Sequence, residues 1–231
     1  MFHLNEMFAL WPGRKLRFDG PTKSIGFRDL YHVEGQRFGM VQAMGLDAAY
    51  GEIVHYLKSL VARSPLRRIG ILREVTRIPA LAAARILGNA KVFVGLMEDL
   101  PYRENRVLFD PLRPNEISLK YTYHPEMLAR RRAFRKHIHK AMRGHRHMFL
   151  TFQPELNFGH PCGTLCFGNS PETSVLNTDC RVHNLDNLYV VDASFMPTSM
   201  GVNPSLTIAA NALRVADKII KSDIGRGKKN D

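Results

Sequence analysis

Apolar residues recur three and four positions apart between residues 65 and 87, the spacing of one face of a helix. We expect an interruption of this helix near Pro79, because proline lacks the backbone N–H that a helix interior uses. Gly88 then ends it. A shorter helix is expected from about residue 48 to residue 60. The rest of residues 1–64 mixes glycine, aromatic and charged residues without a period, so it predicts no architecture.

Three runs of β-branched and aromatic residues follow, at 91–97, 106–110 and 116–123, and proline, asparagine and aspartate separate them. This composition favours strands. In the third run apolar and polar side chains alternate, so one face should pack against protein while the other meets solvent or a cavity. The face expected to pack carries Ile117, Leu119, Tyr121 and Tyr123.

Residues 125–143 predict a basic amphipathic helix whose apolar stripe needs a protein core and whose basic side chains lie on a solvated face. The stripe consists of Met127, Phe134, Ile138 and Met142, and the basic residues include Arg130, Arg131, Arg132, Arg135, Lys136 and Lys140. Together with His137, His139, His145 and His147, this helix leaves open a nucleic-acid surface or an alternating-histidine metal site. No recognised nucleic-acid module accompanies it, so we do not expect nucleic acid as the partner.

The run from Asn187 to Asp192 is apolar until its last residue, the pattern of a strand buried on both faces. Ligands of α/β sheets collect at the carboxyl edge, where Asp192, Ala193 and Ser194 would lie. Asp192 would accept hydrogen bonds from hydroxyl groups there. The alternative is that this aspartate begins a turn or caps a helix.

Asn203 and Pro204 predict the start of a helix, because Asn is a favoured N-cap and Pro is favoured at the first helical position. The helix would continue from Ser205 to about Ile220. The first N–H groups of such a helix form a cluster of donors with partial positive charge, which suits a carbonyl or an anion. A simple cap is the competing explanation.

His160 precedes a proline in a glycine-rich segment, which restricts it to extended backbone geometry. A neutral imidazole with a pKa of ~6.5 can take the proton of an alcohol whose carbon gives up hydride. The alternative is an ordinary surface histidine.

Several motifs in a fixed order resemble the carboxy-terminal region of the glucose-methanol-choline (GMC) flavin oxidoreductases. The resemblance extends roughly from Lys91 to Ile220. Its motifs are His160-Pro-Cys-Gly-Thr164, Arg181-Val-His183, Asn187-Leu-Tyr-Val-Val-Asp-Ala-Ser194, Asn203-Pro204 and Thr207.

This resemblance implies an enzyme that uses FAD to oxidise CH–OH groups of an alcohol, polyol or sugar, with hydride passing to flavin N5. It places His160 at the family's catalytic histidine, the base, and Asn203 at the second position, which orients the substrate oxygen. It also places cofactor-binding residues in two groups. Asp192 and Ala193 match positions near the ribityl chain and pyrophosphate, and Pro204, Ser205 and Leu206 match backbone near the flavin pyrimidine.

The sequence departs from the family pattern because it contains no Gly-x-Gly-x-x-Gly turn, the motif with which relatives hold the pyrophosphate. We therefore expect that a complementing FAD-binding segment or chain exists. A catalytically silent remnant or interaction protein without FAD is the alternative.

Composition narrows these possibilities only a little. The chain has 231 residues, 45% of them hydrophobic, and a net charge of +12, which suits a globular protein with an anionic partner or cofactor. Three cysteines argue against a disulfide framework. A zinc cluster is the other open possibility, although its spacing is not that of standard knuckles; it would use Cys162, Cys166, Cys180, His160 and His183. No apolar run of about 18 residues predicts a membrane span, and the sequence leaves localisation open.

The predicted fold class is α+β: a mostly antiparallel substrate-side sheet with flanking helices, then a final strand and helix that complete an FAD-binding layer, with the amino-terminal dinucleotide-binding part absent. We expect four segments. They are a poorly legible substrate-side and helical segment (1–88), a substrate-side sheet and basic helix (89–159), a catalytic and FAD-contacting segment (160–220) and a flexible tail (221–231).

Overall fold

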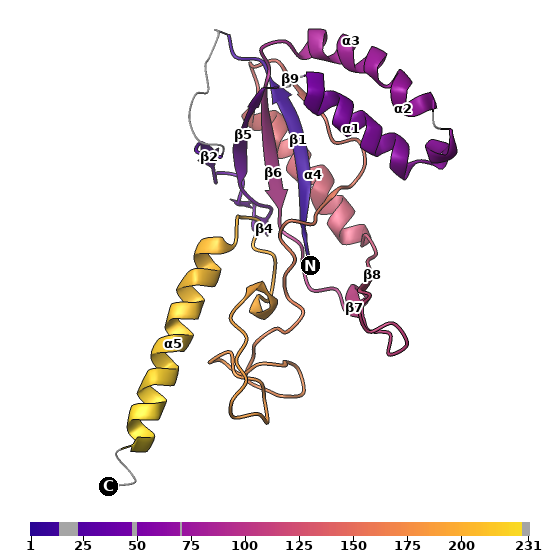
Figure 1. Ribbon diagram of the computed structural model, residues 1–231. Helices are drawn as coiled ribbons and strands as arrows, with labels where there is room; N and C mark the ends of the chain where they lie inside the picture. Colours follow the sequence, from indigo (N-terminus) through magenta and orange to yellow (C-terminus); the bar gives the residue numbers. More distant parts are fainter. Residues whose placement is uncertain (14–22, 48–49, 70, 228–231) are drawn as a thin grey trace.

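A computed structural model describes residues 1–13, 23–47, 50–69 and 71–227. At its centre is an antiparallel sheet in the order β10-β1-β6-β5-β2, in which β9 also pairs with β1 (Figure 1). The strands of this sheet are β1 (His3–Leu10), β2 (Gly26–Phe27), β5 (Val41–Asp47), β6 (Lys91–Met97), β9 (His147–Phe149) and β10 (Leu156–Asn157). Two short strands, β3 (His32–Val33) and β4 (Gln36–Arg37), form a separate hairpin.

Strand β1 lies in the stretch for which the sequence predicts no element. It pairs with β6 from Leu4 opposite Met97 to Leu10 opposite Lys91. Its polar residues His3 and Glu6 are fully buried. These two residues break the hydrophobic alternation that normally reveals a strand, and for this reason β1 is not apparent in the sequence.

Helix α4 (Pro125–Ala141) packs against the sheet and confirms the predicted amphipathic helix. Its stripe residues Met127, Phe134 and Ile138 are fully buried. The close packing depends on Gly95 in β6, because a Cβ at this position would lie 2.7 Å from the Phe134 ring.

The prediction that the basic residues of α4 all face solvent is wrong. Arg130 is 7% exposed and donates to Glu126 Oε1 at 2.8 Å. Arg131 and Arg135 both bond to the fully buried carboxylate of Glu6. Since a buried charge is costly unless it is paired, the fold turns these three arginines toward the protein.

A helical region lies between β5 and β6 in the sequence. It consists of α1 (Tyr50–Arg63), the 3₁₀ helix η1 (Pro65–Arg68), α2 (Ile71–Val75) and α3 (Arg77–Leu87). Residues 48 and 49, where we expected the first helix to begin, lie outside the described residues. The break between α2 and α3 falls at Thr76 and not near Pro79. Pro79 is the third residue of α3, where a backbone N–H has no intrahelical partner to lose. Gly88 ends α3 as predicted.

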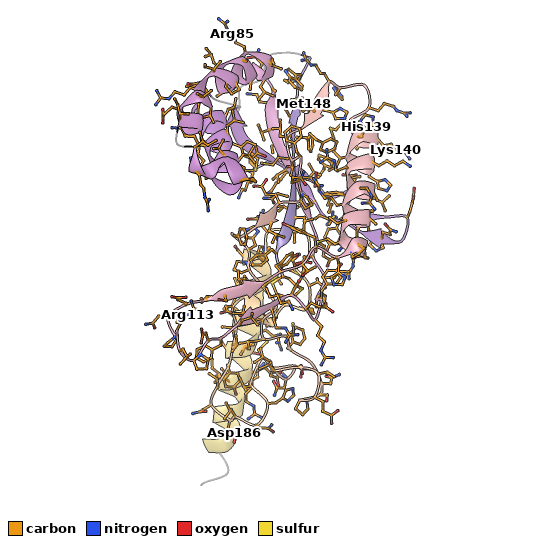
Figure 2. The ribbon with its side chains drawn as sticks, turned by 90° about the vertical axis from the view of Figure 1, so that its right-hand side faces the viewer. Arg85, Arg113, His139, Lys140, Met148 and Asp186 are labelled. Atoms are coloured by element: carbon orange, nitrogen blue, oxygen red, sulfur yellow. The ribbon has the colours of Figure 1, made fainter. Side chains whose placement is uncertain are left out.

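The second and third predicted strands form a hairpin of their own, β7 (Arg106–Leu108) and β8 (Ser118–Lys120). The expected packed face is present only at its end. Ile117 and Leu119 are 80% and 50% exposed, whereas the Tyr121 hydroxyl donates to Asp99 Oδ2 at 2.9 Å. Figure 2 shows this hairpin, with Arg113 at its tip, projecting away from the main sheet.

Residues 160–204 form irregular loops around a second hydrophobic cluster, and α5 (Ser205–Gly227) runs beside them and contributes Val215 to this cluster (Figure 1). The prediction of a buried strand at residues 187–192 is wrong, because the structure has no strand there. Tyr189 makes one isolated bridge with Arg181, and Leu188 is 47% exposed. This segment has lateral bonds to residues 180–182, which is too little to build a strand buried on both faces.

The observed architecture is α+β with an antiparallel sheet, as predicted. Figure 2 shows Arg85 and Asp186 at opposite ends of the molecule, with the sheet between them. In the part of the chain that the structure covers, no helix is long and apolar enough to cross a membrane.

Candidate active site

His160 lies just beyond β10 and contacts the sheet through one ring nitrogen. Its Nδ1 is 3.1 Å from Nδ1 of His3, the first residue of β1, and 3.4 Å from Nδ2 of Asn157. The imidazole is partly buried, and burial lowers its pKa, with a smaller contribution from Lys23. A histidine with a lowered pKa is neutral at pH 7 and can accept a proton.

His3 is held at both ring nitrogens. Its Nε2 lies 2.6 Å from the backbone oxygen of Ser199, opposite the contact with His160. Burial lowers the pKa of His3 from 6.5 to about 4, the Ser199 hydrogen bond opposes this shift, and His160 adds to it. His3 is therefore neutral near pH 7.

The His160 motif lies directly beside the segment that contains Asp192 and Ala193. Gly163 N–H donates to the Ala193 carbonyl at 3.1 Å. Gly163 has φ of +76°, and a Cβ there would lie 2.9 Å from the Met196 oxygen, so the approach requires glycine. The loop fold thus joins two motifs that lie 30 residues apart in the sequence.

Asp192 acts as a cap in this structure, which was the alternative to the ligand role. Its Oδ1 accepts from Ser194 N–H at 2.8 Å and begins the 3₁₀ helix η2 (Ala193–Phe195). Asp192 is exposed to solvent. A cap and a ligand contact use different oxygens and do not exclude each other.

We predicted that Asn203 caps α5, but the structure shows that it does not. Its Nδ2 donates to Gln42 Oε1 in β5 at 2.8 Å, and its Oδ1 is buried without a hydrogen-bond partner. The bond to Gln42 orients the amide away from the helix, which is the physical reason that the cap is not made. A buried acceptor without a donor is uncommon in proteins and points to a missing bound group.

The segment 199–203 lies across the end of the sheet. The Ser199 oxygen meets His3 of β1, and the Gly201 oxygen accepts from Met40 N–H, just before β5, at 2.9 Å. Because neighbouring strands are antiparallel, the start of β1, the end of β6 and the start of β5 share one end of the sheet. His160 and Asn203 are therefore attached to the same end.

The first turn of α5 presents backbone donors at this end. Pro204 is buried, whereas Ser205 and Leu206 are exposed, Leu206 by 83%. Ile208 N–H donates to the Pro204 oxygen, so the N–H groups of Ser205, Leu206 and Thr207 precede the hydrogen-bond ladder of the helix. Helix starts of this kind favour negative charge.

The residues present fit one side of a flavin. They offer a buried acceptor at Asn203 Oδ1, exposed N–H donors at the start of α5, an aspartate beside the His160 motif, and a neutral histidine. This set suits a ring that has both donors and acceptors and that becomes negatively charged on reduction.

One hollow lies away from these residues, whereas a second is lined in part by Thr207 in the first turn of α5. One, of about 370 Å³, is lined by Arg37, Glu98, Glu126 and Arg130 among others, and the second, of about 490 Å³, lies along α5 beside Phe167, Phe195 and Arg214. Among the residues that the structure describes, no three or more His, Cys, Asp or Glu side chains are grouped to hold a metal ion. The zinc alternative therefore gains no support from the geometry.

Comparison with known families identifies the region that contains this site. Residues 101–212 match the model of the family described as GMC oxidoreductase, and the match includes His160, Asp192 and Asn203. This region of the chain is therefore similar to the carboxy-terminal part of the GMC oxidoreductases.

Individual relatives agree with the family match. A 60-residue stretch is 50% identical to 6'''-hydroxyparomomycin C oxidase of Streptomyces lividus and covers 26% of this chain and 11% of that protein. A 100-residue stretch is 38% identical to a cholesterol oxidase of Acinetobacter baumannii and covers 41% and 17%. A third relative is 2-methyl-1,2-propanediol dehydrogenase of Mycolicibacterium austroafricanum, 45% identical over 67 residues that cover 28% and 12%. Each match spans less than a fifth of the relative's own length.

Among solved structures, pyridoxine 4-oxidase from Mesorbium loti is similar to this chain with a TM-score of 0.49 and 18% identity. The similarity covers 94% of this chain and 42% of that chain.

Sequence reasoning missed two residues of the site, His3 and Gln42. Both are buried polar residues on strands β1 and β5, and each contacts a residue that the sequence did single out. The sequence did contain a signal for each of these residues, namely a polar side chain near the start of a hydrophobic stretch. It could not be used without knowing that residues 1–64 supply central strands.

Proposed function

We propose that this chain is the carboxy-terminal part of an FAD-dependent oxidoreductase that acts on a CH–OH group of an alcohol, polyol or sugar. The observation that carries the proposal is the attachment of His160 and Asn203 to one end of the sheet, with Asn203 Oδ1 buried and unbonded. The GMC oxidoreductase match over residues 101–212 supports the same conclusion.

In this proposal His160 is the base. It takes the hydroxyl proton on its imidazole ring. Asn203 would orient the substrate oxygen by donating the second hydrogen of its Nδ2, whose first hydrogen is bonded to Gln42 Oε1 and holds the amide in place. Removing the proton matters because hydride leaves a carbon readily only when the attached oxygen becomes alkoxide-like. Bound FAD supplies the acceptor for that hydride at its N5 atom.

Five residues would hold the cofactor. Asp192 and Ala193 would lie near the ribityl chain and pyrophosphate, and the backbone of Pro204, Ser205 and Leu206 would lie near the flavin pyrimidine. The exposed start of α5 supports this assignment because its N–H groups can stabilise negative charge there.

A complementing FAD-binding segment or chain completes the enzyme in this proposal. Support comes from two facts: the sequence has no Gly-x-Gly-x-x-Gly turn, and α5 exposes Leu206 and Leu213 by 83% and 73%. These two leucines lie seven residues apart, on one face of the helix, where such a segment would cover them. In the division proposed from the sequence, residues 160–220 carry the catalytic and cofactor-contacting groups.

The test is FAD retention with and without the missing part. The chain is purified alone, and also after co-expression with an FAD-binding amino-terminal segment from a GMC relative, and visible flavin absorbance is recorded after gel filtration. We expect flavin with the co-expressed pair and little with the chain alone. A pair that co-purifies without flavin would contradict the proposal and favour a catalytically silent interaction protein.

A further inference from the structure

His3 occupies a position that neither the sequence motifs nor the proposed mechanism assigns. It is fully buried at the start of β1, yet it contacts His160 over a separation of 157 residues. The other side of its ring contacts the Ser199 oxygen at 2.6 Å. One buried imidazole therefore links the proposed base to a fixed point of the backbone.

The Ser199 oxygen is held firmly in position. Ser199 is fully buried, its N–H donates to the Asp99 oxygen at 3.1 Å, and its Oγ accepts from Asp99 N–H at 2.7 Å. The two residues that follow, Met200 and Gly201, both have left-handed backbone conformations, with φ of 62° and 60°. The carbonyl direction of Ser199 is thus set by its surroundings and not by His3.

This carbonyl determines which nitrogen of His3 carries a proton. A carbonyl oxygen only accepts, so the contact at 2.6 Å requires the proton of His3 on Nε2. His3 is neutral, since burial lowers its pKa to about 4, and its Nδ1 therefore carries a lone pair. The contact of 3.1 Å with His160 then requires a proton on Nδ1 of His160.

A proton on Nδ1 of His160 leaves the lone pair on Nε2. Asn157 opposes this arrangement weakly, because its Nδ2 is also directed at Nδ1 of His160. That contact is 3.4 Å, however, and Asn157 Oδ1 is already engaged by Gly159 N–H at 3.0 Å, which fixes the amide. The shorter histidine–histidine contact decides the tautomer.

We infer that His3 is a positioning residue that fixes the tautomer of His160, through the chain Ser199 O, His3, His160, so that Nε2 of His160 is the proton acceptor. The inference rests on the proposed function for the meaning of that acceptor. When Nε2 takes a proton, His160 becomes an imidazolium whose Nδ1–H still donates to the neutral His3. No proton has to leave the pair, and the charge is stabilised by a hydrogen bond that already exists.

The test reads the tautomer directly. Long-range ¹H–¹⁵N spectra are recorded on this chain, labelled with ¹⁵N in its 10 histidine rings, at a pH one unit or more above the ordinary histidine pKa. His160→Asn and a His3 variant assign the two signals by their absence. We expect the proton of His160 on Nδ1 and that of His3 on Nε2. A wild-type spectrum with the His160 proton on Nε2 would overturn the inference.

Two substitutions test whether His3 determines the tautomer of His160. In His3→Gln a side-chain amide can still donate toward Ser199 but offers no acceptor at the Nδ1 position, so His160 should lose its Nδ1–H signal. In His3→Asn an acceptor oxygen remains near that position, and the signal should return. An unchanged His160 tautomer in folded His3→Gln would also overturn the inference. If neither variant folds, the wild-type spectrum still decides.

These spectra require no FAD, so they separate the inference from the proposed function. An Nδ1–H tautomer at His160 together with absence of flavin chemistry in the completed enzyme would reject the proposed function alone. Alcohol-dependent flavin reduction with the opposite tautomer would reject the inference alone.

Discussion

Gly201 lies so close to Gly39 that a Cβ on Gly201 would meet Gly39 Cα at 2.8 Å and the Phe38 oxygen at 2.9 Å. This contact fixes the segment 199–203 to the end of the sheet. Because Ser199 and Asn203 flank Gly201, the contact sets the positions of both the Ser199 carbonyl that His3 contacts and the Asn203 amide.

Gly201→Ala should therefore destabilise the fold. The φ of +60° costs about 1–2 kcal/mol for a residue with a Cβ, and backbone atoms that cannot move away add to this. Gly144→Ala is the matched control, because Gly144 also has a positive φ, of +88°, but a Cβ there meets no atom within 4 Å. Urea unfolding should show a larger loss for Gly201→Ala. Equal losses would mean that the Gly39 contact contributes nothing.

Stability should fall as the pH falls from 6.5 toward 4, because of His3. Its pKa is lowered from 6.5 to about 4 in the folded chain, so between these values the unfolded state binds the proton and the folded state does not. The stabilisation is complete above pH 6.5 and decreases by up to about 3 kcal/mol on acidification. Urea unfolding across this range checks it. A variant with Gln at position 3 should have a flatter profile, and an identical slope would contradict the assignment.

Glu6 should be among the most sensitive charged positions. Burial raises the pKa of Glu6, while the guanidinium groups of Arg131 and Arg135 oppose the shift. Glu6→Ala would leave two inward-facing arginines without their carboxylate, and breaking such a buried pair costs about 3–5 kcal/mol. Glu116→Ala, which breaks an exposed pair with Arg113, is the control and should change stability by about 0.5 kcal/mol or less. Thermal unfolding that ranks the two equally would be the contrary result.

Asn203→Ala should slow flavin reduction in the completed enzyme, but less than loss of His160. Gln42→Ala removes the same hydrogen bond and keeps the Asn203 amide, so it is the matched control. Both variants should lose about 1 kcal/mol of stability. The reduction rate, measured by stopped-flow absorbance, should fall more in Asn203→Ala. If the two variants lose rate equally, Asn203 has only a structural role.

Local periodicity was sufficient to predict several elements. The stripe of Met127, Phe134 and Ile138 predicted α4, and Gly88 predicted the end of α3. The run at 91–97 predicted β6. These predictions succeeded because each signal depends only on residues that are neighbours in the sequence. The α+β class followed from them.

The sequence could not reveal features that depend on long-range contacts. Strand β1 was missed because His3 and Glu6 are polar in sequence but buried against partners 157 and 125 residues away. The cap at Asn203 failed because Gln42 competes for its amide. The strand predicted at residues 187–192 did not form because a strand needs lateral partners. This segment has only the bridge between Tyr189 and Arg181 and hydrogen bonds to residues 180–182.

The roles proposed for the site residues stay predictions, but the sequence did indicate which residues to consider. Motif order identified His160 and Asn203, and the fold attaches both to one end of the sheet. The motifs could not indicate what supports these two residues. His3 and Gln42 come from the segment 1–64, whose architecture only the three-dimensional structure defines.

The most direct test of the account measures flavin reduction by an alcohol under anaerobic conditions, in the chain completed with an FAD-binding segment. His160→Ala is compared with His139→Ala, a control at an exposed histidine near the far end of α4 (Figure 2). With equal flavin content, we predict a rate about 10²-fold lower for His160→Ala and no change for His139→Ala. Equal rates of flavin reduction in His160→Ala and the wild type would contradict the account.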